Sequence, residues 1–68
     1  MTGKITELQG GRGIGYIVGD DGKTYLFHRG ALRDAWFHEL RTGNAVKFEP
    51  GDGLQAKLVR LEREDKTG

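Results

Sequence analysis

The strongest constraint in this 68-residue chain is an Asp-Gly turn between two short runs of strand-forming residues. Residues 14–18 and 24–28 are rich in β-branched and aromatic side chains, which suit a pleated surface. The Asp-Asp-Gly sequence at residues 20–22 accepts the positive φ that a tight hairpin needs. Residues 4–8 alternate polar and apolar side chains more loosely, and the pair Gly10-Gly11 ends this pattern. Together these patterns predict a three-stranded antiparallel meander.

The rest of the chain adds two strand patterns and one segment with a helical pattern. Residues 45–49 and 55–61 alternate polar and apolar side chains and are separated by a Pro-Gly loop. Residues 31–40 break the two-residue period and predict a short helix or a helical turn. The apolar residues that would share one side of this helix are Ala31, Leu32, Ala35, Trp36 and Leu40.

These elements predict an all-β fold, namely a five-stranded antiparallel OB-fold barrel with a short helical segment between strands 3 and 4. A chain of this length is enough for one domain, so residues 1–68 are expected to form a single unit. Residues 1–3 and 62–68 are expected to be frayed.

Composition narrows the classes of function. The net charge of +1 is far from the basic surplus of a protein that depends on phosphate attraction alone. The chain has neither Ser nor Cys, so it offers no disulfide, thiolate metal site or activated nucleophile. No apolar run reaches membrane-spanning length and no apolar signal core is present, so a cytoplasmic protein with no membrane partner is expected.

Two further chemical interpretations fail on spacing. The glycine-rich run at residues 10–15 is followed by a strand pattern, whereas a phosphate-binding loop requires a Lys-Ser or Lys-Thr pair and a helix. His28 and His38 with their neighbouring acids match no metal-binding spacing. The sequence therefore predicts a non-enzymatic protein without a metal or other cofactor.

Two motifs follow each other closely along the predicted meander. Residues 12–17 read Arg-Gly-Ile-Gly-Tyr-Ile, and residues 25–28 read Tyr-Leu-Phe-His. They resemble the two ribonucleoprotein motifs of the cold-shock domain family, Lys-Gly-Phe-Gly-Phe-Ile and Val-Phe-Val-His. Residues 3–5, 43–49 and 55–56 also resemble that family's opening strand, its fourth strand and the Gln-Ala pair before its last strand.

The resemblance implies binding of single-stranded RNA or DNA, with little sequence preference and the role of an RNA chaperone. In that family, outward-facing rings on the second and third strands stack on successive bases. By matching position, Tyr16, His28 and Phe37 would stack bases, while Arg12 and Arg29 would contact phosphates. The full set of nucleic-acid-binding residues expected here is Arg12, Ile14, Tyr16, Leu26, His28, Arg29, Phe37 and, as an extra candidate, Trp36.

The chain departs from the family where rings would be expected. Ile14 and Leu26 replace phenylalanines of the two motifs, and Glu7-Leu8 replaces a Trp-Phe pair. Aliphatic side chains contact a base but lack a polarised ring face. Arg29, at another family phenylalanine, offsets part of this loss because a guanidinium can both stack and contact phosphate. Weak binding, shifted toward arginine contacts, is therefore expected.

The same replacements support an alternative function. An aliphatic outer face formed by Leu8, Ile14 and Leu26 would make the barrel a protein-interaction or self-associating module that has lost nucleic-acid binding. The partner would then be another protein or a second copy of this chain.

Inward and outward positions can also be predicted for the aromatic residues. Tyr25 and Phe27 alternate with the outward-facing positions of their strand and are expected in the core. For the neighbouring pair, the helical pattern assigns Trp36 to a plug at the end of the barrel, and the family match assigns Phe37 to the nucleic-acid side.

Overall fold

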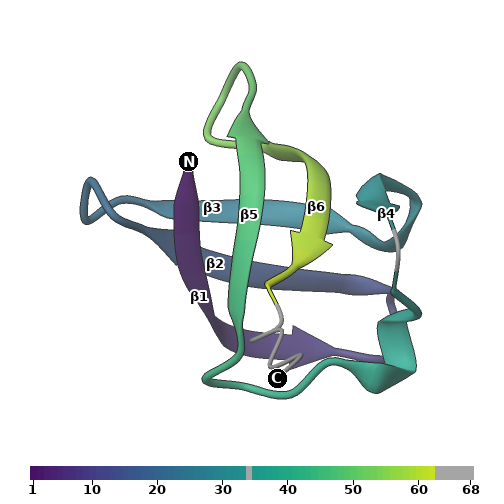
Figure 1. The fold of residues 1–68 in the computed structure, drawn as a ribbon. Helices are drawn as coiled ribbons and strands as arrows, with labels where there is room; N and C mark the ends of the chain where they lie inside the picture. The colour runs from purple at the N-terminus through teal and green to yellow at the C-terminus, as the bar shows by residue number, and fades with distance from the viewer. Residues whose placement is uncertain (34, 63–68) are drawn as a thin grey trace.

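The hairpin predicted around the Asp-Gly turn is confirmed in the computed structural model, which describes residues 1–33 and 35–62 (Figure 1). Gly22 adopts a φ of 83°, the conformation that favours glycine in this turn. The two strands joined by the turn pair antiparallel. The strand that precedes them in the chain also pairs antiparallel with the first of the two. The strands in chain order are β1 (Thr2–Gln9), β2 (Ile14–Gly19), β3 (Thr24–His28), β4 (Leu32–Arg33), β5 (Ala45–Pro50) and β6 (Ala56–Leu61).

The six strands form a nearly closed barrel in the order β3-β2-β1-β5-β6-β4. In Figure 1, β5 and β6 run across β2 and β3, so that the two halves of the sheet face each other. The chain before β6 approaches the free edge of β3, where the Leu26 N–H donates to the Leu54 carbonyl oxygen at 2.9 Å. Leu26 also forms an isolated parallel bridge with Gln55. An all-β barrel is therefore confirmed.

The expected count of five strands is wrong, because a short additional strand, β4, lies within the crossing segment, which is the stretch of residues 29–44 between β3 and β5. β4 pairs in parallel with β6, with Leu32 opposite Val59 and Arg33 opposite Arg60. Its two residues are too few to give a recognisable alternation in the sequence. This strand covers part of the outer edge of β6.

Of the two alternatives for residues 31–40, the α-helix is wrong, since the described residues contain no α-helix, and helical turns are what the structure shows. Two single 3-10 turns take its place, η1 (Arg29–Ala31) and η2 (Phe37–Glu39). Leu32, Trp36 and Leu40 have extended backbones, with ψ between 144° and 149°. An isolated helix of ten residues is marginal in water, and here the segment must cross from β3 to β5 at the end of the barrel.

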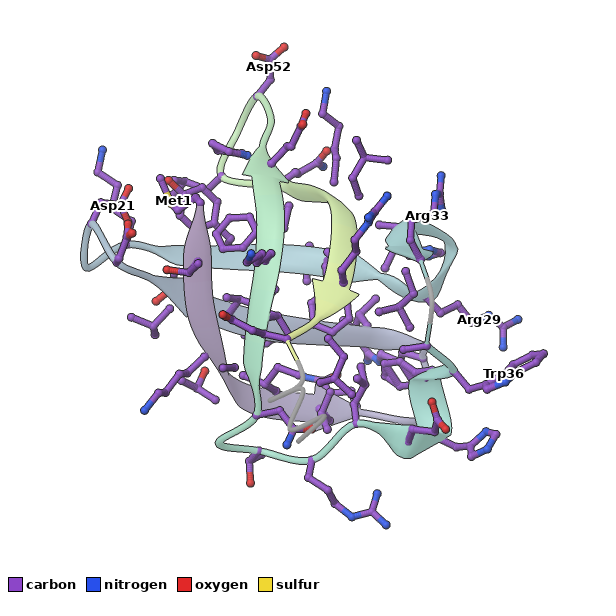
Figure 2. The ribbon with its side chains drawn as sticks, in the orientation of Figure 1. Met1, Asp21, Arg29, Arg33, Trp36 and Asp52 are labelled. Atoms are coloured by element: carbon purple, nitrogen blue, oxygen red, sulfur yellow. The ribbon has the colours of Figure 1, made fainter. Side chains whose placement is uncertain are left out.

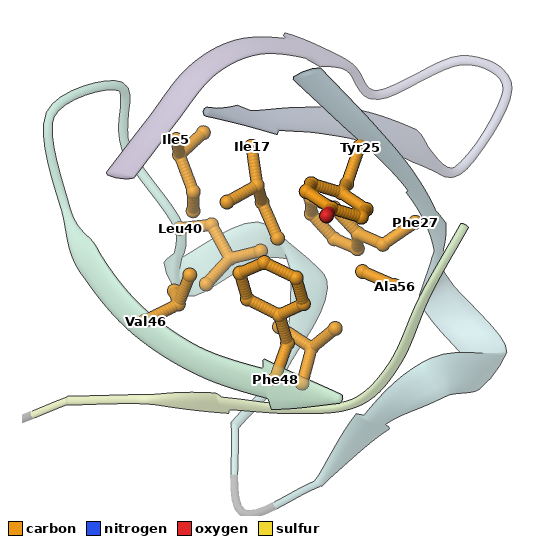
Figure 3. Packing of buried hydrophobic residues seen from close by; sticks show 9 residues of the cluster. Ile5, Ile17, Tyr25, Phe27, Leu40, Val46, Phe48 and Ala56 are labelled. Carbon is orange, nitrogen blue, oxygen red and sulfur yellow. The ribbon is translucent and has the colours of Figure 1, made fainter. Parts of the chain in front are cut away.

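The barrel interior is filled by the inward residues of β1, β2, β3, β5 and β6, together with Leu40 from the crossing segment (Figure 3). Tyr25 and Phe27 are buried, which confirms their predicted place in the core. Their rings pack with those of other aromatic residues, Tyr25 with Phe48 at 5.0 Å and Phe27 with Phe37 at 6.2 Å between centroids. The buried hydrophobic residues are Ile5, Ile17, Tyr25, Phe27, Leu40, Val46, Phe48, Ala56 and Val59.

A bulge in β1 changes which side chains of this strand face inward. Ile5 pairs with Ile17 and Glu7 pairs with Tyr16, so Thr6 is an extra residue opposite no partner. After the bulge the alternation is reversed, and Leu8 packs against the core. The expectation that Leu8 belongs to an aliphatic outer face is therefore wrong.

The beginning of the chain is held by β5. The N-terminal amine of Met1 donates to the Phe48 carbonyl oxygen at 2.9 Å, and Thr2 pairs with Lys47. Fraying was expected for residues 1–3, of which residues 2 and 3 lie within β1. Of the other expected frayed segment, residues 63–68 lie outside the described residues, and the Glu62 N–H donates to the Ala45 carbonyl oxygen at 2.9 Å.

The hairpin turn contains a carboxylate that makes folding sensitive to pH. Asp21 accepts hydrogen bonds from the Lys23 backbone N–H at 3.0 Å and from the Tyr25 hydroxyl at 2.7 Å. These two bonds, in that order of importance, hold the pKa of Asp21 below its usual 3.8. The same bond to Asp21 raises the pKa of Tyr25 above 10.0.

We expect the charged Asp21 to stabilise the fold above about pH 4, and this contribution to disappear as the pH falls through its lowered pKa. The neutral Tyr25 hydroxyl stabilises below about pH 10, and its contribution disappears as the pH rises through its raised pKa. Thermal unfolding of the protein and of Asp21→Asn, compared between about pH 6 and about pH 2, tests the acid limb. The difference in Tm should shrink toward acid pH; a difference independent of pH would contradict this role of Asp21.

Candidate functional site

The outward side chains of β1, β2 and β3 form one surface, called here the outer β1–β3 face. Cross-strand pairing sets them in three rows, each with one residue from each strand. The rows, written from β1 to β3, are Lys4, Val18 and Thr24; Glu7, Tyr16 and Leu26; and Gln9, Ile14 and His28.

Four of the residues expected to bind nucleic acid meet on this face. Tyr16 is paired with Leu26, and Ile14 is paired with His28. Ile14, Tyr16 and Leu26 are half-buried, and His28 is exposed. Two rings are thus interleaved with two aliphatic side chains on neighbouring strands. This arrangement offers flat apolar area with a polar group at the His28 end.

Gly15 explains why the backbone of β2 can lie so close to the core beneath this face. A Cβ added at Gly15 would lie 2.6 Å from Phe27 Cε1 and 3.0 Å from Leu8 Cδ2. Only a residue without a side chain leaves room for the Phe27 ring at this point. The inward Phe27 therefore sits directly under the strand that presents Ile14 and Tyr16.

Both expected arginines lie at the end of the face where Ile14 and His28 pair. Arg12 is exposed in the turn before β2, and its N–H donates to the Gln9 carbonyl oxygen at 3.0 Å. Arg29 follows β3, and its N–H donates to the Gly13 carbonyl oxygen at 2.7 Å. The structure therefore places a cation on each of the two chain segments that border this end.

The structure reverses the expected positions of the two aromatic residues in the crossing segment. Trp36 is 69% exposed, so its assignment as a plug at the barrel end is wrong. Phe37 packs against the core, with its ring tilted by 54° against that of Phe27. The helical pattern misled the first assignment, because the segment is not an α-helix and its side chains do not follow a helical period.

Lys4 and Gln9 share the outer β1–β3 face but were absent from the expected site. The bulge at Thr6 is the reason that Gln9 was missed, since it puts Lys4, Glu7 and Gln9 on one side of the strand. A strict two-residue period would have grouped Lys4 with Thr6 and Leu8 instead. The residue types in β1 do not predict the bulge.

Glu7 is the carboxylate nearest the centre of the face in the strand pairing, and it accepts a hydrogen bond from the Gln9 side-chain amide at 3.0 Å. A negative charge here would repel the phosphates of any single strand that stacked on Tyr16. At about 8 Å in water, such a repulsion costs about 0.5 kcal/mol. Removing it should therefore have a small but measurable effect on binding.

We expect Glu7→Gln to bind an oligopyrimidine single strand about twofold more tightly at low salt. The gain should disappear at high salt, where exposed charges are screened. Fluorescence anisotropy of a labelled strand gives both values. The matched control is Glu49→Gln on β5, outside the face. An equal gain in the control would show a general charge effect and contradict a specific role for Glu7.

Within residues 1–33 and 35–62, no helix has the length and apolar character to cross a membrane. The same residues hold no group of three or more His, Cys, Asp or Glu side chains placed to bind a metal ion.

The barrel with its two motifs on neighbouring strands fits an OB-fold cold-shock domain. The chain is similar to Cold shock protein 1 of Arabidopsis thaliana, with 33% identity over 57 residues, which is 82% of this chain. It spans 19% of the length of that protein. No protein-family model matches the chain.

Proposed function

We propose that this protein is a non-enzymatic, cold-shock-like domain that binds single-stranded RNA or DNA on its outer β1–β3 face. The observation that carries the proposal is the grouping of Ile14, Tyr16, Leu26 and His28 in paired positions on β2 and β3. The similarity to a cold shock protein supports the same class of function. Binding with little sequence preference would suit an RNA chaperone that keeps strands unpaired.

Stacking supplies the main attraction in this proposal. Bases stack on Tyr16 and His28, and Ile14 and Leu26 fill the apolar area between the rings. Each base–ring stack contributes about 1–3 kcal/mol and depends little on the base, because every base has a π-face. Two such stacks with limited aliphatic contact correspond to dissociation constants in the millimolar to micromolar range. This gives the weak, low-specificity binding that the missing rings imply.

Arg12 and Arg29 hold the phosphates at the His28 end of the face. A cation that neutralises one phosphate of a single strand releases counterions and contributes about −0.7 to the slope of log K against log salt. The net charge of only +1 means that such contacts must be local rather than general. The salt slope therefore counts the phosphate contacts directly.

The test is a titration of a fluorescein-labelled oligopyrimidine strand, followed by anisotropy at several salt concentrations. The protein should bind the strand at low salt, and Arg29→Gln should reduce the salt slope by about 0.7. The control is Lys47→Gln, an exposed cation on β5 that should leave the slope unchanged. Absence of binding with the protein raised to about 1 mM would overturn the proposal. Light scattering on the same samples reports whether Ile14 and Leu26 instead mediate self-association.

A further inference from the structure

A groove of about 450 Å³ lies where β4 meets the outer side of β6, and it is called here the β4–β6 groove. In Figure 2 the labelled Arg33 lies on β4, at the right-hand edge of the barrel and next to β6. Of the described residues that line the groove, none belongs to the expected nucleic-acid site. They come from η1, β4, β5 and β6 and are Gly30, Ala31, Arg33, Glu49, Lys57 and Leu58.

Leu58 reaches this groove because β6 contains a bulge. The pairing of β6 with β5 shifts between Lys47 and Glu49, so that one more residue lies on β6 than on β5. Val59 is buried in the core, whereas its neighbour Leu58 is turned outward and is 41% exposed. The bulge therefore re-aims a large aliphatic side chain from the barrel into the groove.

The backbone of Leu58 is strained in this position. Its φ of 51° lies in the left-handed region, where a Cβ comes too close to the following carbonyl oxygen. Bulges with a residue in this conformation usually have glycine there. Strain of this kind persists only where the surrounding structure holds it, and it gathers at binding sites. A contact made by the Leu58 side chain outside the barrel explains why a leucine occupies a position that suits glycine.

Two cations line the groove beside Leu58, and both are held in place. Arg33 Nη1 donates to the carbonyl oxygens of Gly30 and Leu32, at 3.1 Å and 2.9 Å. The stem of Lys57 lies against Gly51, where an added Cβ would be 3.2 Å from Lys57 Cε. Side chains that are already restrained lose less freedom when they bind an anion.

The charge of the groove selects the chemistry of its occupant. Arg33 and Lys57 outnumber Glu49, which is the only carboxylate among the described lining residues, and Arg60 adds a positive charge beside Arg33. A second copy docked through the same groove would bring cations against cations. A nucleic-acid strand would find no ring to stack on among those lining residues. An acidic polypeptide with an aliphatic side chain matches both the cations and Leu58.

We propose that the β4–β6 groove binds an acidic segment of a partner protein. One aliphatic side chain of the segment packs against Leu58, and carboxylates on either side of it pair with Arg33 and Lys57. The inference does not depend on nucleic-acid binding. It leaves the outer β1–β3 face open, so a single strand and the partner can occupy the domain together.

The probe is the end-blocked peptide Glu-Glu-Glu-Leu-Glu-Glu-Glu, added to isotopically labelled protein up to about 5 mM while backbone amide NMR shifts are recorded. The amides of Arg33, Lys57 and Leu58 should shift with one common midpoint. Those of Tyr16 and His28 should change little. The affinity should fall as salt is added, because exposed charges are screened.

Variants separate the apolar contact from the charged one. Leu58→Ala should weaken binding by about 3–10-fold, and Arg33→Gln by about 2–5-fold at low salt. A peptide with glycine in place of its leucine should bind the parent protein and Leu58→Ala equally, since the apolar contact is then absent from both. The matched controls are Leu54→Ala, at an exposed leucine with a φ of 58°, and Lys23→Gln, at an exposed cation. Both should bind like the parent.

Leu58→Gly tests whether the side chain is kept for the contact rather than for the fold. It should lose peptide binding to the same extent as Leu58→Ala. Its Tm should nevertheless be a few degrees higher than that of Leu58→Ala, because glycine accepts a φ of 51° without strain. A lower Tm for the glycine variant would contradict the strained backbone on which the inference depends.

The inference is overturned if no amide shifts at about 5 mM peptide, or if the shifts centre on the outer β1–β3 face. Equal losses in the two control variants would also overturn it. Shifts of the groove amides with protein concentration alone would assign the groove to a second copy, and shifts with an oligopyrimidine strand would assign it to nucleic acid. The proposed function fails separately, when that strand does not bind through Tyr16.

Discussion

Phe27→Ala should lower the free energy of unfolding by about 3–5 kcal/mol, the largest stability effect expected for any residue of this barrel. Phe27 is 1% exposed and lies between the backbone of Gly15 and the ring of Phe37. Its removal leaves a cavity that Gly15 cannot fill, because a glycine has no side chain to move into it. At about 0.05–0.15 kcal/mol of stability per residue, a domain of 68 residues has about 3–10 kcal/mol in all, so this loss removes from about a third to all of its stability.

Urea unfolding followed by circular dichroism measures this effect. The midpoint should fall by several molar or the variant should be unfolded without denaturant, given a slope of about 1 kcal/mol per molar for a small protein. Leu26→Ala is the matched control, since Leu26 is the adjacent residue of β3 and faces outward. A loss in Phe27→Ala no greater than that in Leu26→Ala would contradict the inward placement of Phe27.

Tyr16→Ala should weaken the binding of a single strand by about 5–150-fold, the largest functional effect expected from one residue of the face. Tyr16 occupies the middle row, between Glu7 of β1 and Leu26 of β3, so a bound strand must pass over it. Its side chain is half-buried at the surface and is not part of the buried core, so its removal should change stability little.

Tyr16→Phe separates the ring from the hydroxyl. Since stacking needs only the ring, this variant should bind within a few-fold of the parent protein. Anisotropy titrations at one low salt concentration compare the three proteins, with thermal unfolding as the check on folding. Parent-like affinity in Tyr16→Ala would place the binding site elsewhere.

The sequence predicts the hairpins and the core of this barrel because local chemistry determines them. The Asp-Gly pair sets the turn at Gly22, and the alternation of Tyr25 and Phe27 with Leu26 sets the face that each side chain occupies. The positions of Ile14 and Tyr16 follow from the same period. The sequence alone therefore predicts that Ile14, Tyr16, Leu26 and His28 lie together, as they do on β2 and β3.

The remaining differences arise where tertiary contacts override local patterns. The bulge at Thr6 turns Leu8 inward, and it depends on how β1 pairs with β2 rather than on the residues of β1 alone. In the crossing segment, Leu40 enters the core while Trp36 stays outside, because the span between β3 and β5 favours short turns over a helix. Neither feature has a periodic signal in the sequence.

The most direct test of the account is a map of backbone amide NMR shifts during titration with an oligopyrimidine single strand. The largest changes should occur along β2 and β3, around Tyr16 and His28, and continue to Arg29 and Trp36. Amides of β5, such as that of Lys47, should change little. Changes centred on β5 and β6, or no changes at about 1 mM strand, would contradict binding on the outer β1–β3 face.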